Sequence, residues 1–192
     1  MLPWEHAAVG YLAYSLYARV VHRQPPRGDA VLAVAFAALL PDLIDKPLAW
    51  GAGALPSGKS LAHSLLFAGP AIVLAGLAAG RRIAVAFALS YLLHLGGDVL
   101  FPVALGHAPA YRFLFYPLIE LPAADTPGLF ARAGEVIHTF YEFLQTSRGR
   151  IYVLFEGALL GTTVVLWLFD GRPGLATIRR WLLPERADPF ST

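Results

Sequence analysis

Hydrophobic residues along the chain gather into five long apolar segments separated by short polar stretches. The segments run from about His6 to Val21, Ala30 to Leu40, Leu61 to Ala79, Ile83 to Val103 and Ile151 to Phe169. Each comes near the roughly 20 residues that a helix needs to cross a bilayer, although the second needs the polar residues after Leu40 to do so. The pattern predicts an all-α fold, a polytopic membrane bundle of about five transmembrane helices.

The stretch 104–149 has a different pattern. Four prolines interrupt it: Pro109, Pro117, Pro122 and Pro127. Between Leu129 and Leu144 apolar and polar residues follow the period of an amphipathic helix, which lies along a membrane surface rather than across it. We therefore expect 104–149 to form a non-cytoplasmic loop with short helices, inside a single membrane-embedded domain of residues 1–192.

Composition agrees with a membrane protein. Hydrophobic residues make up 57% of the chain and charged residues 15%, which leaves too little polar surface to cover a soluble domain of 192 residues. The net charge of +2 gives little support to nucleic-acid binding, and none is expected. The absence of cysteine excludes thiolate catalysis, disulfides and Cys-ligated zinc.

Basic residues predict how the bundle is oriented. With five spans, the Arg19–Arg27 loop, the Arg81–Arg82 turn and the C-terminal tail fall on one side, which carries nine of the 15 Lys and Arg residues. An excess of Lys and Arg marks the cytoplasmic side. The N-terminus, the loop between Lys46 and Lys59 and the stretch 104–149 are then non-cytoplasmic.

Residue types that bind metals gather on that non-cytoplasmic side. They are His6, Asp42, Asp45, His63, His94, Asp98, His107, His138 and Glu142. His94 and Asp98 are four residues apart, as are His138 and Glu142, so each pair shares one helix face. Imidazole and carboxylate without thiolate suit zinc, manganese or iron. Two or three such ions can activate water and hold a phosphoryl oxygen.

An isolated polar residue in an apolar helix is more often packed or hydrogen-bonded than a ligand. We interpret His22, in the basic loop, and Glu156, in the last apolar segment, in that way. For His107, His138 and Glu142 both interpretations stay open, because a surface helix commonly carries such residues without binding a metal.

Four short motifs resemble a known family when they are taken in order. They are His6-x-x-x-Gly10, Pro41-Asp42-Leu43-Ile44-Asp45, Lys59-Ser60-Leu61-Ala62-His63-Ser64 and His94-Leu95-Gly96-Gly97-Asp98. Over about residues 1–105 the chain is similar to the YdjM-type family of membrane-bound metal-dependent hydrolases. The resemblance implies an integral protein of a prokaryotic-type plasma membrane with a divalent-metal site on its non-cytoplasmic side.

A more distant resemblance is to zinc-dependent phospholipase C and related single-strand nucleases, which are helical and hold three zinc ions. Their ligand order is similar to the order of metal-binding residues here: His6, Asp42, His63, His94, Asp98, His107, His138 and Glu142. This resemblance implies two or three zinc ions, a bridging role for Asp98, and a place for the last three residues in the site.

These observations predict hydrolysis of a phosphate ester such as a phospholipid, with the membrane lipid as the partner and no protein partner identifiable. Asp42 and Asp98 are expected to act in catalysis. Lys59, Ser64 and Asp45 are expected to contact the substrate, since Lys59 offers a positive charge to a phosphate.

Three other functions compete with this prediction. Gly53–Ser60 fits the phosphate-loop pattern, but that loop requires a preceding strand, and the sequence predicts a helix there. Intramembrane His and Asp can also carry protons or metal ions in a transporter, although the residues lie toward one face rather than at the midplane. A non-catalytic membrane scaffold would bind no metal.

Overall fold

The fold is entirely helical in the part of the chain that the computed structural model describes, residues 1–123 and 128–183. These residues form seven α-helices and no strand, which confirms the predicted all-α class. The helices are α1 (Pro3–Val21), α2 (Gly28–Lys46), α3 (Leu65–Ala79), α4 (Arg81–Ala104), α5 (Leu129–Leu144), α6 (Ser147–Phe169) and α7 (Leu175–Leu182), with a π-helical turn η1 (Pro47–Gly51) and a 3-10 turn η2 (Arg112–Phe115).

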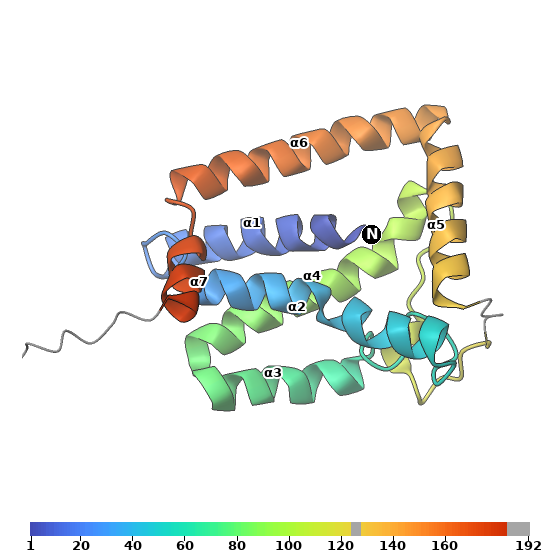
Figure 1. The fold of residues 1–192 in the computed structure, drawn as a ribbon, viewed down its shortest axis with the longest axis horizontal. Helices are drawn as coiled ribbons and strands as arrows, with labels where there is room; N and C mark the ends of the chain where they lie inside the picture. The colour runs from blue at the N-terminus through green and yellow to red at the C-terminus, as the bar shows by residue number, and fades with distance from the viewer. Residues whose placement is uncertain (124–127, 184–192) are drawn as a thin grey trace, which may run out of the picture.

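Helix α4 is the centre of the bundle and packs against α1, α2 and α3 (Figure 1). Helix α6 lies along the outer side of α1, and the short α7 packs against α2. Helix α5 crosses the end of the bundle where α1 begins and α4 ends, and it contacts α6. The predicted amphipathic helix is therefore present, and it spans the predicted residues Leu129–Leu144.

A glycine allows α1, α2 and α4 to approach closely. A Cβ atom on Gly10 would lie 2.5 Å from the Ser90 hydroxyl and 3.2 Å from a Val34 methyl group. The Ser90 hydroxyl donates a hydrogen bond of 2.8 Å to the carbonyl of Val34. Small residues at such crossings are typical of membrane helices, because they let two backbones come together.

Two of the described helices, α4 and α6, are long and apolar enough to cross a membrane. The prediction of about five transmembrane helices is therefore not confirmed. Helix α2 carries Asp29, Asp42 and Asp45, and α3 has only 15 residues. In α1 the apolar run is interrupted by charged and tyrosine residues.

The outer face of α6 is strongly apolar. Ile151, Leu154, Phe155 and Phe169 each leave more than 60% of their surface exposed. Large exposed apolar patches of this kind mark contact with a membrane or a partner. Together with the length of α6, this surface fits a helix that faces lipid.

Polar contacts hold α6 to α1 at both of its ends. At one end the Trp4 indole donates a hydrogen bond of 2.6 Å to Glu156, and the Tyr152 hydroxyl donates to Glu5. At the other end Asp170 accepts hydrogen bonds from Tyr11 at 2.5 Å and Ser15 at 2.9 Å, and it pairs with Arg19. These contacts fix the position of α6 along α1.

Basic side chains concentrate at the end of the bundle away from α5. The described ones are Arg19, Arg23, Arg27, Arg81, Arg82, Arg172, Arg179 and Arg180, on the end of α1, the starts of α2 and α4, and the segment after α6. The start of α1 and the ends of α2 and α4 lie at the opposite end (Figure 1). This set of eight arginines is therefore separated from the start of α1 and the ends of α2 and α4.

Candidate metal centre

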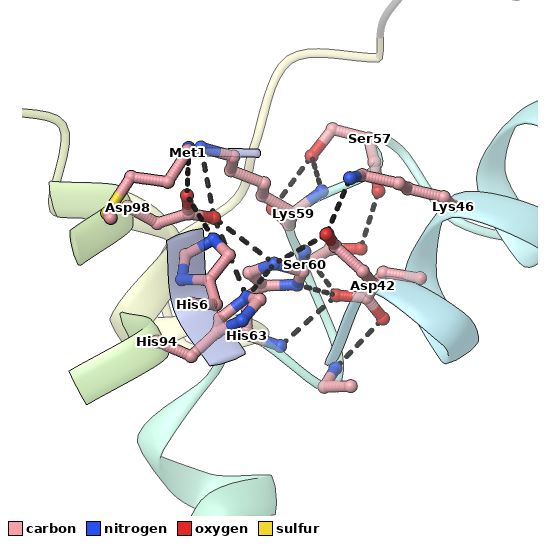
Figure 2. Close-up of polar contacts among 12 residues, drawn as sticks. Met1, His6, Asp42, Lys46, Ser57, Lys59, Ser60, His63, His94 and Asp98 are labelled. Atoms are coloured by element: carbon pink, nitrogen blue, oxygen red, sulfur yellow. Dashed lines mark hydrogen bonds and ion pairs between the residues drawn. The ribbon is translucent and has the colours of Figure 1, made fainter. Parts of the chain in front are cut away.

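Five histidine and aspartate side chains of types that can bind metals meet in one place (Figure 2). His6 comes from α1, Asp42 from α2, and His94 and Asp98 from one face of α4. His63 comes from the loop between η1 and α3, because α3 begins at Leu65 rather than at the predicted Leu61. All five are buried, with at most 8% of each residue exposed.

The five side chains form two overlapping groups whose ligand atoms lie within 4.8 Å of one another. One group is His6, His94 and Asp98, and the other is Asp42, His63 and His94. The Nε2 atoms of His63 and His94 are 3.1 Å apart. Since His94 belongs to both groups, the two are parts of one centre.

The Asp98 carboxylate faces both groups. Its Oδ1 lies 3.5 Å from Nε2 of His6, and its Oδ2 lies 3.3 Å from Nε2 of His63. A carboxylate with its two oxygens directed at different ligand groups has the geometry needed to bridge two cations. Asp98 therefore lies between the two groups.

Hydrogen bonds orient the rings of His94 and His63. Nδ1 of His94 lies 2.7 Å from the carbonyl oxygen of Ala38, and because a carbonyl only accepts, the ring proton is on Nδ1. Nδ1 of His63 lies 2.8 Å from Asp45. In both rings Nε2 is therefore turned toward the centre. Such outer partners are typical of metal-ligating histidines.

Asp45 lies behind His63, which differs from the predicted contact with substrate. It is fully buried and accepts hydrogen bonds from the backbone N–H groups of Ser60 at 2.8 Å, Ala62 at 2.9 Å and His63 at 3.1 Å. These bonds shape the loop that carries His63. Asp45 is thus placed as a positioning residue.

Ser64 also has a structural position in place of the predicted substrate contact. Its hydroxyl accepts a hydrogen bond of 3.2 Å from the N–H of Phe67 and donates one of 2.8 Å to the carbonyl of Leu61. Ser64 is the N-cap of α3 and is fully buried. A Ser at this position satisfies a backbone donor that the first helical turn leaves free.

Three positive groups contact the carboxylates of the centre (Figure 2). The Lys59 ammonium lies 3.0 Å from Oδ2 of Asp98, and the Met1 amino group lies 3.0 Å from Oδ1 of Asp98. The Lys46 ammonium lies 2.7 Å from Asp42. The sequence had indicated Lys59 but not Lys46 or Met1. The i, i+4 spacing of Asp42 and Lys46 was the signal that could have found Lys46.

Two further observations indicate that the centre suits a cation. Nε2 of His6 is buried without a hydrogen-bond partner among the described residues, so one potential ligand atom is free. Burial of the His63 ring would lower its pKa, but the neighbouring Asp42, Asp45 and Asp98 raise it to about 9. The carboxylates therefore favour positive charge at this point. The donor set of imidazole and carboxylate fits a divalent metal.

The structure does not bring His107, His138 and Glu142 into this centre, contrary to the prediction. All three are exposed, and His138 and Glu142 keep 73% and 66% of their side-chain surface. Phe140 and Phe143 of α5 pack against Tyr152 of α6, while Phe130 and Ile137 of the same helix are exposed. His138 and Glu142 are exposed as well and take no part in the centre.

The phosphate-loop pattern does not form a phosphate loop. The loop before Ser60 follows the π-helical turn η1, and the described residues contain no strand that could precede it. The Ser60 hydroxyl donates to the carbonyl of Ser57, and its N–H is bound by Asp45. The motif instead places Lys59 beside Asp98.

The sequence of the chain was compared with known proteins and protein families. No curated protein and no solved structure was found to match it. A family model described as YdjM inner membrane protein matches residues 1–172, which include every helix from α1 to α6 and all five residues of the centre. This family and the two apolar helices together indicate a membrane protein. The chain belongs to the YdjM inner membrane protein family.

Proposed function

We propose that this protein is a membrane-bound metal-dependent hydrolase of phosphate esters. The observation that carries the proposal is the Asp98 carboxylate, buried between His6 on one side and His63 and His94 on the other. Burying three histidines and two aspartates together is costly unless they are paired or bind a cation. A hydrolytic centre explains why the helices converge there.

The ligand set favours divalent ions, and we propose zinc, with two ions rather than three. The two overlapping ligand groups support two positions, and the exposure of His107, His138 and Glu142 argues against a third. Bound divalent ions would supply Lewis acidity, which polarises a phosphoryl oxygen and lowers the pKa of a coordinated water.

Residues of the chain would supply the other catalytic and positioning roles. Asp98 would hold the two metal positions together, and Asp42 would accept the proton of the attacking water. Lys46 and Lys59 carry positive charges beside these carboxylates, where they would attract and orient a phosphate. His94 and His63 would be held in place by Ala38 and Asp45.

The proposed centre opens on the non-cytoplasmic side. The support is the contrast between the two ends of the bundle, since Arg19 near the end of α1, Arg27 just before α2, and Arg81 and Arg82 at the start of α4 lie at the end opposite the centre. Figure 1 shows these helix ends on the same side of the bundle. Basic residues mark the cytoplasmic end of a membrane protein.

The proposal is tested by metal analysis and hydrolysis with the purified full chain. The parent is expected to contain a divalent metal and to hydrolyse simple phosphate monoesters or diesters, and a chelator should abolish the activity. His63→Ala should lose both metal and activity. His22→Ala, the same substitution at the basic end, should keep both. A parent protein without bound metal and without activity after metal is supplied would overturn the proposal.

A further inference from the structure

We infer that a cavity beneath α5 binds the hydrocarbon chain of an amphiphilic phosphate ester whose phosphate lies at the metal centre. This inference rests on the proposed function and names its substrate class. The cavity has a volume of about 470 Å³, which is within the roughly 300–1,000 Å³ of small-molecule sites. It lies between α5, the start of α1 and the last turn of α4.

The lining of the cavity is largely apolar. It includes Met1, Phe101, Leu105, Val136, Phe140 and Phe143. The charged lining residues, Arg132 and Glu135, pair with each other at 2.8 Å. Since the two charges are matched, the cavity offers no unpaired ion to a polar ligand, and it favours a hydrocarbon.

The cavity adjoins the metal centre through two elements. Met1 lines the cavity, and its amino group lies 3.0 Å from Asp98. Phe101 follows Asp98 by three residues on α4, which is a rise of about 4.5 Å and nearly the same helix face. A molecule whose anionic head is bound by Lys59 and by the metal ions that Asp98 would hold would therefore have its tail directed into the cavity.

The position of α5 favours a lipid over a polypeptide as the occupant. Helix α5 has no buried residue and lies across the end of the bundle (Figure 1). In this proposal α5 lies at the membrane surface, as amphipathic helices do. A membrane supplies amphiphiles with one charged head and long chains at this depth. The cation-binding centre beside an apolar cavity is complementary to a lipid phosphate.

Binding of alkylphosphonates tests the inference without requiring turnover, because their carbon–phosphorus bond is not hydrolysed by a phosphoesterase. Butylphosphonate, octylphosphonate and hexadecylphosphonate would be bound to the full chain in nanodiscs, with protein-free nanodiscs as the correction for partitioning. Each methylene buried in the cavity should improve affinity by about fourfold, until the cavity is filled.

Two neighbouring substitutions on α5 provide a matched pair. Val136 lines the cavity, whereas the adjacent Ile137 does not and is 68% exposed. Val136→Trp should fill the cavity and weaken hexadecylphosphonate binding by at least about tenfold while leaving butylphosphonate unchanged. Ile137→Trp should change neither.

The outcomes separate the two proposals. Affinity that does not depend on chain length, or equal effects of Val136→Trp and Ile137→Trp, would overturn the cavity as a chain-binding site even if short phosphate esters are hydrolysed. Chain-dependent binding that Val136→Trp abolishes would support the cavity even if no ester is hydrolysed, and in that case the proposed hydrolase function alone would fail.

Discussion

Asp98 is the residue on which most contacts of the centre depend. It lies within 4 Å of His6, His63, His94 and Lys59, and it is 1% exposed. These neighbours come from α1, from the loop before α3 and from α4 itself. The two oxygens of Asp98 therefore link parts of the chain that are distant in sequence. A change there should affect metal binding before it affects the helices.

Asp98→Asn keeps the shape of the side chain but removes its negative charge and one acceptor oxygen. We expect the metal affinity to fall more than about 100-fold, because even outer partners of metal ligands contribute 10–100-fold. Phosphate-ester hydrolysis should be lost, while circular dichroism should show an unchanged helical content. Metal analysis of variant and parent checks this expectation, and equal metal content would contradict the role of Asp98.

Asp45→Asn should have a smaller effect of the same kind. The amide retains one acceptor for the loop N–H groups but cannot hold the His63 ring as a carboxylate does. Metal affinity is expected to fall about 10–100-fold, with partial activity at saturating metal. Titration of the metal-free protein with zinc measures the difference. A variant that binds zinc as tightly as the parent would exclude Asp45 as a positioning residue.

Glu142→Gln is the control for both acid-to-amide changes. The Glu142 side chain is exposed and lies 3.8 Å from His138, outside the centre. Metal content and activity should stay at the parent level. If this variant lost metal as Asp98→Asn does, the centre would have to include α5 after all.

At the residue scale, the sequence predicts which side chains come together better than how those side chains are oriented. His6, Asp42, His63, His94 and Asp98 were identified because ionisable residues in apolar segments are rare. Asp45 and Ser64 were expected to contact the substrate, whereas in the structure both are hydrogen-bonded to the loop before α3, whose fold depends on hydrogen bonds between residues distant in sequence. Spacing alone does not show which side of a histidine faces the cation.

At the scale of helices, α1 and α4 are matched in register around the centre. His6 and Gly10 are four residues apart on α1, as are Ser90 and His94 on α4. The Gly10–Ser90 contact therefore lies one turn from the stacked rings of His6 and His94, whose centroids are 3.7 Å apart. The close approach at Gly10 sets the helix separation at which the rings meet.

Gly10→Ala should weaken metal binding although it removes no ligand. Its Cβ would lie 2.5 Å from the Ser90 hydroxyl, so α1 must move away from α4. We expect the free energy of unfolding to fall by about 1–3 kcal/mol, which lowers the melting temperature. The zinc affinity should fall as well. The double variant Gly10→Ala/Ser90→Gly should recover part of both, which a merely local effect on α1 would not produce.

Gly134→Ala is the matched control on α5. A Cβ atom there meets nothing within 4 Å, so the substitution should be neutral or slightly stabilising. If Gly134→Ala and Gly10→Ala changed the zinc affinity equally, the helix contact would not control the geometry of the centre.

The sequence predicted where the helices lie more accurately than which way each helix faces. The apolar runs of α4 and α6 were located correctly, and the bounds of α5 agree with the prediction. The inward face of α5 was not predictable, because both faces carry plausible partners: His138 and Glu142 on one side, Val136 and Phe140 on the other. Packing of Phe140 against Tyr152 decides the orientation.

For the whole molecule, the difference in charge between the two ends predicts how it sits in the membrane. The chain has no cysteine, so single cysteines can report the side of each loop. Ala54→Cys lies in the exposed loop near the metal centre, and Gln24→Cys lies in the exposed basic loop. A membrane-impermeant maleimide applied to intact cells should label Ala54→Cys and not Gln24→Cys. The reverse pattern would place the centre on the cytoplasmic side.

The polar contacts between α1 and α6 also have a consequence for the synthesis of the protein. Glu5 and Tyr152 are 147 residues apart in sequence, and Ser15 and Asp170 are 155 apart. Helix α1 leaves the ribosome first, yet its partners are made near the end of translation. An interrupted chain would leave these groups of α1 without the residues that satisfy them. A chain that ends before Tyr152 would therefore leave Glu5 without this partner, and an unpaired polar group in an apolar environment carries a free-energy cost.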